Sequence, residues 1–462
     1  MRERTVVFYI CPATDGSYDQ RAKSVDHLIY NEKKIAHRLK YDTMTLYGIN
    51  FLGRNAMLAT LIPLFNEKME VSAYSLFAQK ENHLLRPSLL GTGENDGAGE
   101  ILGLDIIQNV GAPALSGGRD LFVTINQFSL FSDVEEQCKG PHSNIVLLCD
   151  PTVAPQESFI NRIIDLKNKG FRFAMRKLAI ENFHDYHEIL AQMDFILLNH
   201  KKINIQNARA FFSKVYPMMK LAAVNVNTQA EYEMLKKSGS FDLYEGEFFR
   251  MPVTEGAKEV APLKANYIQL LKVVNDVDFD LTKAADVVGQ DTALVISLLK
   301  MANTMAVNSE ITSVRHAAAM LGQREMKKWI NTAVTKELCA DKPSEITRLS
   351  LIRGKFAENL APCFNLAMQS QELFLMGMFS VLDIILDKPM EEALEMVKIS
   401  TPIREALLDH EGILAPVYDF IIQYQNASWQ EVSRQMILSE IKMDDVYKAY
   451  VDALCWFKDV FD

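Results

Sequence analysis

Short apolar runs alternate with helix-like segments between about residues 70 and 250. Each run has the length and the β-branched or aromatic content of a strand. The runs are Val71–Phe77, Leu121–Asn126, Asn144–Asp150, Phe171–Met175, Asp194–Asn199, Lys220–Val226 and Asp242–Phe249. Between the third and the fourth run, residues 155–170 have apolar positions at helical spacing and end at Gly170. The alternation predicts parallel strands joined by helical crossovers, and about seven such runs suit a TIM-type (β/α) barrel.

Beyond about residue 255 the apolar period changes from two to 3.6, which predicts an all-helical domain. Ser313 begins a helix over Val314–Leu321 that Gly322 ends, and prolines mark other boundaries. One continuous apolar stripe is predicted for Val287, Val288, Ala293, Leu294, Ile296, Leu298 and Leu299. The predicted fold is thus α/β followed by all-α, with a barrel at residues 56–254 and a helical bundle at residues 255–462. Residues 1–55 are assigned to neither part.

Charge, cysteine spacing and the length of the apolar stretches disfavour several classes of function. The net charge of −10 and the pI near 5.5 disfavour nucleic-acid binding. Six scattered cysteines without a C-x-x-C pair predict free thiols in a reducing cytoplasm. The apolar stretch Leu373–Leu382 is too short to span a membrane, so it is predicted to be a buried core helix.

Functional residues of a barrel lie at the carboxyl ends of its strands. The predicted ends are Asn126, Asp150, Arg176 with Lys177, Asn199, Asn225 to Asn227, and Glu245. A two-metal phosphodiesterase needs several carboxylates there, and only Asp150 and Glu245 are acidic. Two adjacent cationic side chains cannot ligate a divalent metal ion, because their positive charges repel the positive charge of the ion. Arg176 and Lys177 either form ion pairs with Asp150 or Glu245, which we favour, or bind an anion.

Two segments resemble a known family of domains. Residues 58–66, followed by Val71–Phe77, resemble the opening of EAL-type domains, in which a Gly-Tyr-Glu-Leu-Leu strand carries the naming Glu; here that position is Ser75. The family includes two-metal phosphodiesterases that linearise cyclic di-GMP. By this resemblance, the metal-binding Asn of the family is retained as Asn126. The other site positions of the family correspond to Leu148 or Asp150, Arg176 and Lys177, Leu197 and Asn199, Val224 and Asn227, and Glu245. The resemblance therefore implies a degenerate EAL-like barrel with a vestigial or anion-binding pocket.

The helical half resembles HDOD domains. The residues that carry this resemblance are Asp291 to Leu294, Leu298 to Asn303, Ile311 to Ala317, Leu321 with Gly322, and Trp329. HDOD domains resemble metal phosphohydrolases but generally lack the His-Asp pair. Ser380 and Val381 stand at that position here, as a vestigial pair, and the two histidines beyond residue 255 are each followed by a residue other than Asp.

Four weaker signals have plainer interpretations. His184 and His187 have metal-ligand spacing but no evident third ligand, so an exposed helix start is favoured. The glycine-rich residues 91–97 lack the context of a phosphate-binding loop. The helix pair at residues 313–334 imitates a DNA-reading motif, but bundle packing is favoured. Arg353 and Glu358 are expected to anchor a neighbouring helix or the barrel.

These observations predict a catalytically inactive, cytoplasmic bacterial signalling protein that acts as a scaffold through its HDOD domain. No catalytic residue, metal or cofactor is expected, and other signalling proteins are the expected partners. The alternative is a non-hydrolysing sensor of cyclic di-GMP or another anion, with the HDOD domain as output. A residual hydrolase acting through Asp150 and Glu245 is a third interpretation. Membrane and nucleic-acid partners are not expected, and the oligomeric state stays open.

Overall fold

The computed structural model describes residues 57–79, 101–138, 142–250, 262–276, 278–305 and 311–461. These residues belong to one compact unit, Ala56–Asp462. The predicted features of residues 1–55 and the glycine-rich residues 91–97 lie outside the described residues. The domain boundary near residue 255 stays a prediction.

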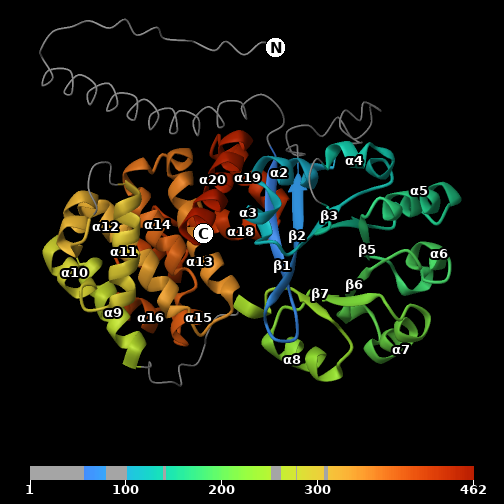
Figure 1. The fold of residues 1–462 in the computed structure, drawn as a ribbon, viewed down its shortest axis with the longest axis horizontal. Helices are drawn as coiled ribbons and strands as arrows, with labels where there is room; N and C mark the ends of the chain where they lie inside the picture. Colours follow the sequence, from blue (N-terminus) through green and yellow to red (C-terminus); the bar gives the residue numbers. More distant parts are fainter. Residues whose placement is uncertain are drawn as a thin grey trace, which may run out of the picture. The chain divides into compact units, whose positions relative to one another are not determined.

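A closed barrel forms the first part of this unit (Figure 1). Its strands follow one another in chain order, β2 to β8 run parallel, and β1 runs antiparallel to both of its neighbours. They are β1 (Leu58–Phe65), β2 (Val71–Gln79), β3 (Asp120–Thr124), β4 (Ile145–Cys149), β5 (Arg172–Arg176), β6 (Phe195–Asn199), β7 (Lys220–Val224) and β8 (Leu243–Glu245). All seven predicted runs are strands, so the barrel prediction is confirmed; β1 is an addition to them.

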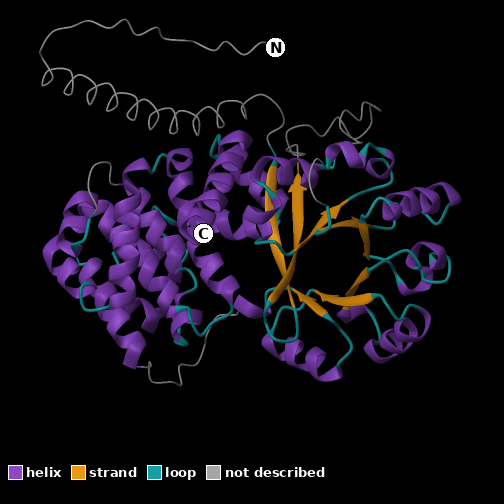
Figure 2. Ribbon diagram, in the orientation of Figure 1, coloured by secondary structure: helices purple, strands orange, loops and turns teal. Residues whose placement is uncertain are grey.

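Alternation along the strands divides the barrel's side chains into two groups. The inward-facing group is an apolar cluster made of Leu64, Ala73, Phe122, Val146, Leu148, Ala174, Phe195, Leu197, Ala222, Val224 and Leu243. The outward-facing residues pack under helices. Figure 2 shows these helices around the strands of the barrel. These helices are α2 (Leu102–Val110), α3 (Ala112–Ser116), α4 (Val134–Gln137), α5 (Glu157–Asn168), α6 (His187–Leu190), α7 (Ile205–Val215) and α8 (Gln229–Ser238). At the amino ends of the strands, Arg172 forms an ion pair with Asp120 at 2.6 Å.

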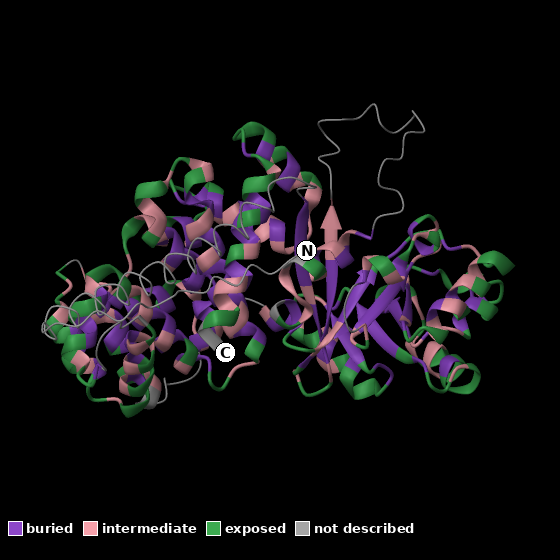
Figure 3. Cartoon of the chain, turned by 45° about the horizontal axis from the view of Figure 1, so that its top comes forward, coloured by how far each residue is buried: buried purple, intermediate pink, exposed green. Residues whose placement is uncertain are grey.

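Among the described residues beyond Pro262, helices are the only regular secondary structure. They are α9 (Pro262–Val274), α10 (Leu281–Val288), α11 (Thr292–Met305), α12 (Val314–Leu338), α13 (Ser344–Leu360), α14 (Ser370–Phe379), α15 (Leu382–Leu386), α16 (Met390–Val397), α17 (Thr401–Leu408), α18 (Ala415–Gln425), α19 (Trp429–Leu438) and α20 (Met443–Phe461). Their inner faces are buried and their outer faces exposed (Figure 3). The helical prediction is therefore confirmed.

Two helix boundaries were predicted with different success. The Ser313 hydroxyl accepts a hydrogen bond from the His316 N–H, and Gly322 interrupts α12 with φ 74°, as the pattern predicted. The single apolar stripe from Val287 to Leu299 is wrong, because α10 and α11 are separate helices. The Asp291 carboxylate starts α11 by accepting from the Leu294 N–H, and Ile296 on the predicted stripe is 63% exposed.

The predicted core helix at Leu373–Leu382 is α14 and the start of α15, and its apolar residues are buried. α14 approaches α13 closely, because a Cβ added at Gly377 would lie 2.4 Å from the Arg353 carbonyl oxygen. No helix in the described part of the chain has the length and hydropathy to cross a membrane. The five described cysteines are free thiols.

The edge of β1 that faces β8 is only partly paired. β8 is short, so only Leu64 and Phe65 have partners on it. We call the remaining edge, residues 58–63, the seam. Helices α18 and α20 satisfy it: the Ala59 N–H donates to the Tyr424 hydroxyl at 3.1 Å, and Tyr450 hydrogen-bonds to the Thr60 side chain and the Leu61 backbone. Burial raises the pKa of Tyr424 well above its ordinary value, so its phenol stays neutral.

A second buried contact joins the barrel to the bundle beside the seam. The Tyr74 hydroxyl on β2 donates to the Glu345 carboxylate on α13 at 2.6 Å. Arg348 forms an ion pair with the same carboxylate at 3.2 Å, and its guanidinium lies 4.8 Å from the centre of the Tyr74 ring. The carboxylate is therefore neutralised inside the contact.

Tyr424→Phe is expected to lower the free energy of unfolding by about 1–3 kcal/mol, because the buried Ala59 N–H would lose its acceptor. Urea unfolding followed by circular dichroism measures the change. Tyr216→Phe is the matched control, because that hydroxyl makes an exposed hydrogen bond to the His187 carbonyl. Equal losses for the two variants would contradict a special role of Tyr424.

Candidate functional site

Three of the predicted pocket residues meet at the carboxyl end of the barrel, which we call the mouth. The two oxygens of the Glu245 carboxylate have different partners. Oε2 accepts from the Ser75 hydroxyl at 2.8 Å, and Oε1 accepts from Nη2 of Arg176 at 3.2 Å. The side chains of Arg176 and Glu245 are 14% and 8% exposed. The interpretation that Arg176 pairs with Glu245 is thus confirmed.

Arg176 spans the mouth, because β5 and β8 are separated by two other strands. Its guanidinium carbon lies 5.0 Å from the centre of the Phe77 ring, which holds it in place. Its Nη1 is buried and has no hydrogen-bond partner among the described residues. A buried donor without a partner is costly, so this nitrogen is a candidate contact for an oxygen of a ligand. Lys177 is exposed and has a left-handed backbone, with φ 60°.

The other predicted pocket residues are engaged in their own loops. The Asn126 side-chain oxygen accepts from the Phe128 and Ser129 N–H groups, and that of Asn199 accepts from the Lys201 N–H. The Asp150 carboxylate accepts from both the backbone N–H and the hydroxyl of Thr152. These contacts are the turn-forming bonds that Asn and Asp commonly make. Asn227 is exposed, and its N–H donates to Glu231.

The barrel interior below Glu245 is apolar. Leu148, Leu197 and Val224, three positions where the EAL resemblance expects polar site residues, belong to the buried inner cluster. No group of three or more His, Cys, Asp or Glu side chains that could hold a metal occurs among the described residues. The donor set present in the mouth therefore does not fit a two-metal centre.

The main chain fixes the position of Glu245. A Cβ added at the following residue, Gly246, would lie 2.0 Å from the Val226 carbonyl oxygen. The Val226 N–H donates to the Glu245 carbonyl, and the Phe248 N–H donates to the Val226 carbonyl. Only glycine allows the chain after β8 to lie this close to the chain after β7.

At the predicted His-Asp position, the structure shows packing contacts. The Ser380 hydroxyl donates to the Gly377 carbonyl at 2.7 Å and accepts from Arg353 at 2.9 Å, and Val381 is buried. Arg353 also donates to the Gln425 side chain on α18 at 2.7 Å, and burial lowers its pKa to about 10. The prediction that Arg353 anchors a neighbouring helix is confirmed.

The two weaker candidate sites, the histidine pair and the helix pair, have the structural roles that we favoured. His184 and His187 are exposed. Burial lowers the pKa of Lys328, whose ammonium lies 2.6 Å from Glu358 and 4.8 Å from the centre of the Phe374 ring. Lys328 thus packs inside the bundle, as we favoured for this helix pair, and Glu358 anchors α13 to α12.

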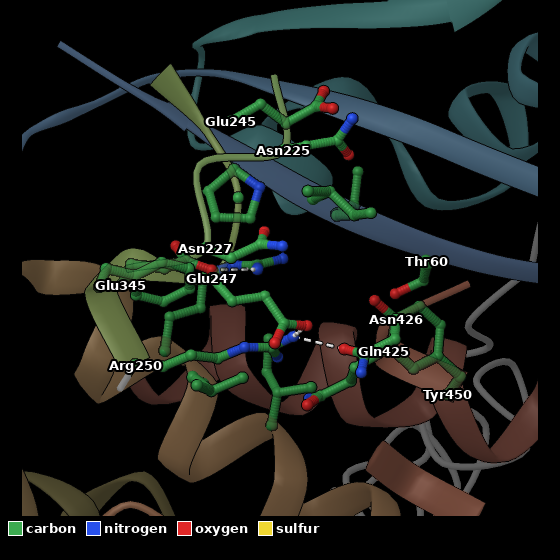
Figure 4. Close-up of a pocket in the computed structure, with 18 residues that line it drawn as sticks. Thr60, Asn225, Asn227, Glu245, Glu247, Arg250, Glu345, Gln425, Asn426 and Tyr450 are labelled. Atoms are coloured by element: carbon green, nitrogen blue, oxygen red, sulfur yellow. Dashed lines mark hydrogen bonds and ion pairs between the residues drawn. The ribbon is translucent and has the colours of Figure 1, made fainter. Parts of the chain in front are cut away.

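The sequence did not reveal a cavity beside the seam (Figure 4). It measures about 360 Å³ and lies between β1, the loops after β7 and β8, and helices α13, α18 and α20. Glu245 lines it, so the mouth and the cavity share one wall. Its residues come from segments up to several hundred positions apart, and no local pattern could have found them.

In comparisons with known proteins, the family model described as the HDOD domain matches residues 260–402. The cyclic di-GMP phosphodiesterase CdgJ of Vibrio cholerae is 27% identical over 328 residues, which are 69% of this chain and 74% of that protein. YuxH of Bacillus subtilis, described as uncharacterized, is 24% identical over 410 residues, 87% of this chain and 98% of the relative. A solved cyclic di-GMP complex of BlrP1 from Klebsiella pneumoniae has 13% identity and a TM-score of 0.33 over 43% of this chain and 56% of that one.

One prediction is contradicted by these comparisons. The sequence predicted a chain without enzymatic activity, whereas a relative with 27% identity is named a phosphodiesterase, which points to enzyme activity. That prediction inferred the loss of catalysis from the loss of the family's metal ligands. The predicted similarity of the chain to proteins of cyclic di-GMP signalling is supported by the same relative.

Arg176→Met and Glu245→Gln are each expected to lower the free energy of unfolding by about 3 kcal/mol, because each leaves a buried polar or charged partner unpaired. The double variant should lose clearly less than the sum. Urea unfolding of all four proteins measures the coupling energy.

The ion pair Arg172–Asp120 at the opposite end of the barrel is the matched control, because its side chains are 31% and 27% exposed. Its coupling energy should be about 1 kcal/mol or less. Additive losses at Arg176 and Glu245 would show that the pair does not support the mouth.

Proposed function

We propose that this chain, an EAL-like barrel followed by an HDOD domain, is a cytoplasmic bacterial signalling protein linked to cyclic di-GMP. In this proposal the mouth of the barrel binds the nucleotide, and the HDOD domain binds a partner protein. The observation that carries it is the shared position of Glu245, which pairs with Arg176 in the mouth and lines the cavity against the bundle. A change in the mouth therefore reaches the surface on which the bundle rests.

Arg176 and Lys177 supply the positive charge for a phosphate. Nη1 of Arg176 is buried without a hydrogen-bond partner in the part of the chain that the structure describes, and the exposed Lys177 follows Arg176 in the chain. The strand ends of a barrel are a common phosphate site. Charge-assisted hydrogen bonds from a guanidinium to phosphate are among the stronger polar contacts in proteins. Glu245 holds the guanidinium in the mouth until a phosphate competes for it.

The contact between barrel and bundle supports a relay. A nucleotide that drew Arg176 toward its phosphate would weaken the Glu245 contact at 3.2 Å. Glu245 would then carry an uncompensated charge in the wall that faces α13 and α18. A ligand shifts an equilibrium only through such a difference in interaction between two states. The buried Tyr74–Glu345 bond next to this wall keeps the bundle in register with the barrel.

The full chain is expected to bind cyclic di-GMP, and Arg176→Met should weaken binding about tenfold or more, because a hydrogen bond to a charged group is lost. Isothermal titration calorimetry measures both affinities. Arg172→Met is the matched control, because it removes an arginine from the same strand at the opposite end of the barrel and should leave the affinity unchanged.

Partner capture by the full chain from the native cell should change when cyclic di-GMP is added, and this change should vanish in Arg176→Met. Absence of nucleotide binding at several hundred micromolar would refute the proposal, as would equal affinity losses in the two arginine variants.

Hydrolysis of cyclic di-GMP is a second candidate function, favoured by the name of the Vibrio cholerae relative. Among the acids predicted for the pocket, Glu245 is the one buried in the mouth. Hydrolysis in this barrel would therefore depend on Glu245.

The purified chain should then release linear dinucleotide, and Glu245→Gln should lower the initial rate at least a hundredfold. Chromatography of the products measures the rate. Glu247→Gln, two residues further on, is the control and should keep the rate within about twofold. Equal rates in wild type and Glu245→Gln would remove this candidate.

A further inference from the structure

A small pocket lies inside the helical bundle, and all of its lining residues come from helices α12, α13 and α14. Its volume is about 90 Å³. Pockets for drug-sized ligands measure about 300–1,000 Å³, so this one admits only a compact group. The buried Phe374 and the half-buried Leu375 form the apolar part of its wall. The pocket shares no residue with the mouth or with the cavity beside the seam.

The charges that line this pocket do not cancel. Three cations and two carboxylates are present, so one positive charge is left over. They are Arg324, Lys327, Lys328, Glu358 and Glu372. Just outside the lining, Glu325 lies 3.9 Å from Arg324, and Lys355 lies 2.9 Å from Glu358. These two outer neighbours have opposite charges, so they leave the balance of the pocket unchanged.

The excess positive charge lies on Lys327. Lys328 and Glu358 already form an ion pair at 2.6 Å. The ammonium of Lys327 is half-buried and has neither a hydrogen bond nor an ion pair among the described residues. Burial lowers the pKa of Lys327, and Asp276 and Glu372 oppose this shift only from beyond ion-pair distance. A partly buried ammonium without a partner is costly, so an anion beside Lys327 is favoured.

The neighbouring polar groups differ in what they can offer a ligand. Arg324 precedes Lys327 by three residues on α12, so the two side chains lie on the same face of the helix. The buried Asn331 is fully engaged: its NH₂ group donates to Asn275 and to the Lys327 carbonyl, and its oxygen accepts from Asn275. Lys327 and Arg324 are therefore the groups that can contact an anion.

Charge and wall together select one class of anion. A single excess charge matches a monoanion, whereas a phosphate dianion would be repelled by Glu358 and Glu372. A chloride ion would leave the apolar surface of Phe374 and Leu375 without a partner. A carboxylate on a short aliphatic chain satisfies both parts of the pocket.

We propose that this pocket binds a short aliphatic monocarboxylate. Its carboxylate forms an ion pair with Lys327 and accepts a hydrogen bond from Arg324, and its carbon chain packs against Phe374 and Leu375. The ligand bridges α12 and α14 and so stabilises this part of the bundle. The site goes beyond the proposed function, and it uses no residue of the barrel.

The test titrates the full chain with sodium butyrate by isothermal titration calorimetry at constant ionic strength. Butyrate is expected to saturate one site with a Kd of about 1 mM or tighter. Butyramide has nearly the same size but no charge, so it should bind at least about tenfold more weakly. Octanoate should bind no more tightly than butyrate, because the pocket has no room for the longer chain.

Substitutions locate the site. Lys327→Met should lower the affinity for butyrate at least about tenfold, because the carboxylate loses its charged partner. Lys327→Arg keeps the positive charge and should stay within about threefold of wild type. Lys300→Met is the matched control, because Lys300 is an exposed lysine on α11 that does not line the pocket, and it should leave the affinity unchanged.

Four results would overturn the proposal: no saturation by butyrate up to about 50 mM, equal affinity for butyramide, wild-type affinity in Lys327→Met, or displacement of butyrate by an equal concentration of inorganic phosphate. The comparison of butyrate with butyramide uses the unaltered chain, so it decides the matter even if a variant fails to fold. A failure of cyclic di-GMP binding would refute the proposed function alone and leave this inference standing.

Discussion

The unpaired edge of β1 is the constraint on which the rest of the structure depends. β8 is three residues long, so it pairs with only the last two residues of β1. A buried backbone N–H without an acceptor costs about 1–3 kcal/mol, and Tyr424 and Tyr450 of the bundle provide the missing partners. The bundle is therefore a structural part of the barrel wall. The same short strand places Glu245 where barrel and bundle meet.

The mouth is held together by a charge balance across the barrel. Arg176 reaches from β5 to Glu245 on β8, with Phe77 beneath its guanidinium and the Ser75 hydroxyl on the other carboxylate oxygen. This arrangement leaves one guanidinium nitrogen without a hydrogen-bond partner among the residues that the structure describes. In the proposed function, this one side chain both supports the barrel and contacts the ligand, so the two roles compete for the same positive charge.

Sequence patterns predicted the strands because strand burial is local: inward and outward positions alternate at period two, and all seven runs form strands. The same local reasoning failed between Val288 and Leu294, because a capping carboxylate outweighed apolar periodicity. Arg176 was correctly paired with Glu245 because both end parallel strands. The contact between Tyr74 and Glu345 joins residues 271 positions apart, and no period reveals it. Inferring lost catalysis from lost ligands was the step that the comparisons contradict.

Gly246 gives the mouth an unusual property. Its backbone lies so close to Val226 that the path of the chain around Glu245 is fixed by main-chain contacts and by the absence of a side chain one position later. The residue at position 245 can therefore be exchanged without rebuilding the loop that carries it. Because Arg176 and Glu245 depend on each other, we expect the chemistry of this barrel to change by paired exchanges at positions 176 and 245, while the main-chain path that presents them to the bundle is kept.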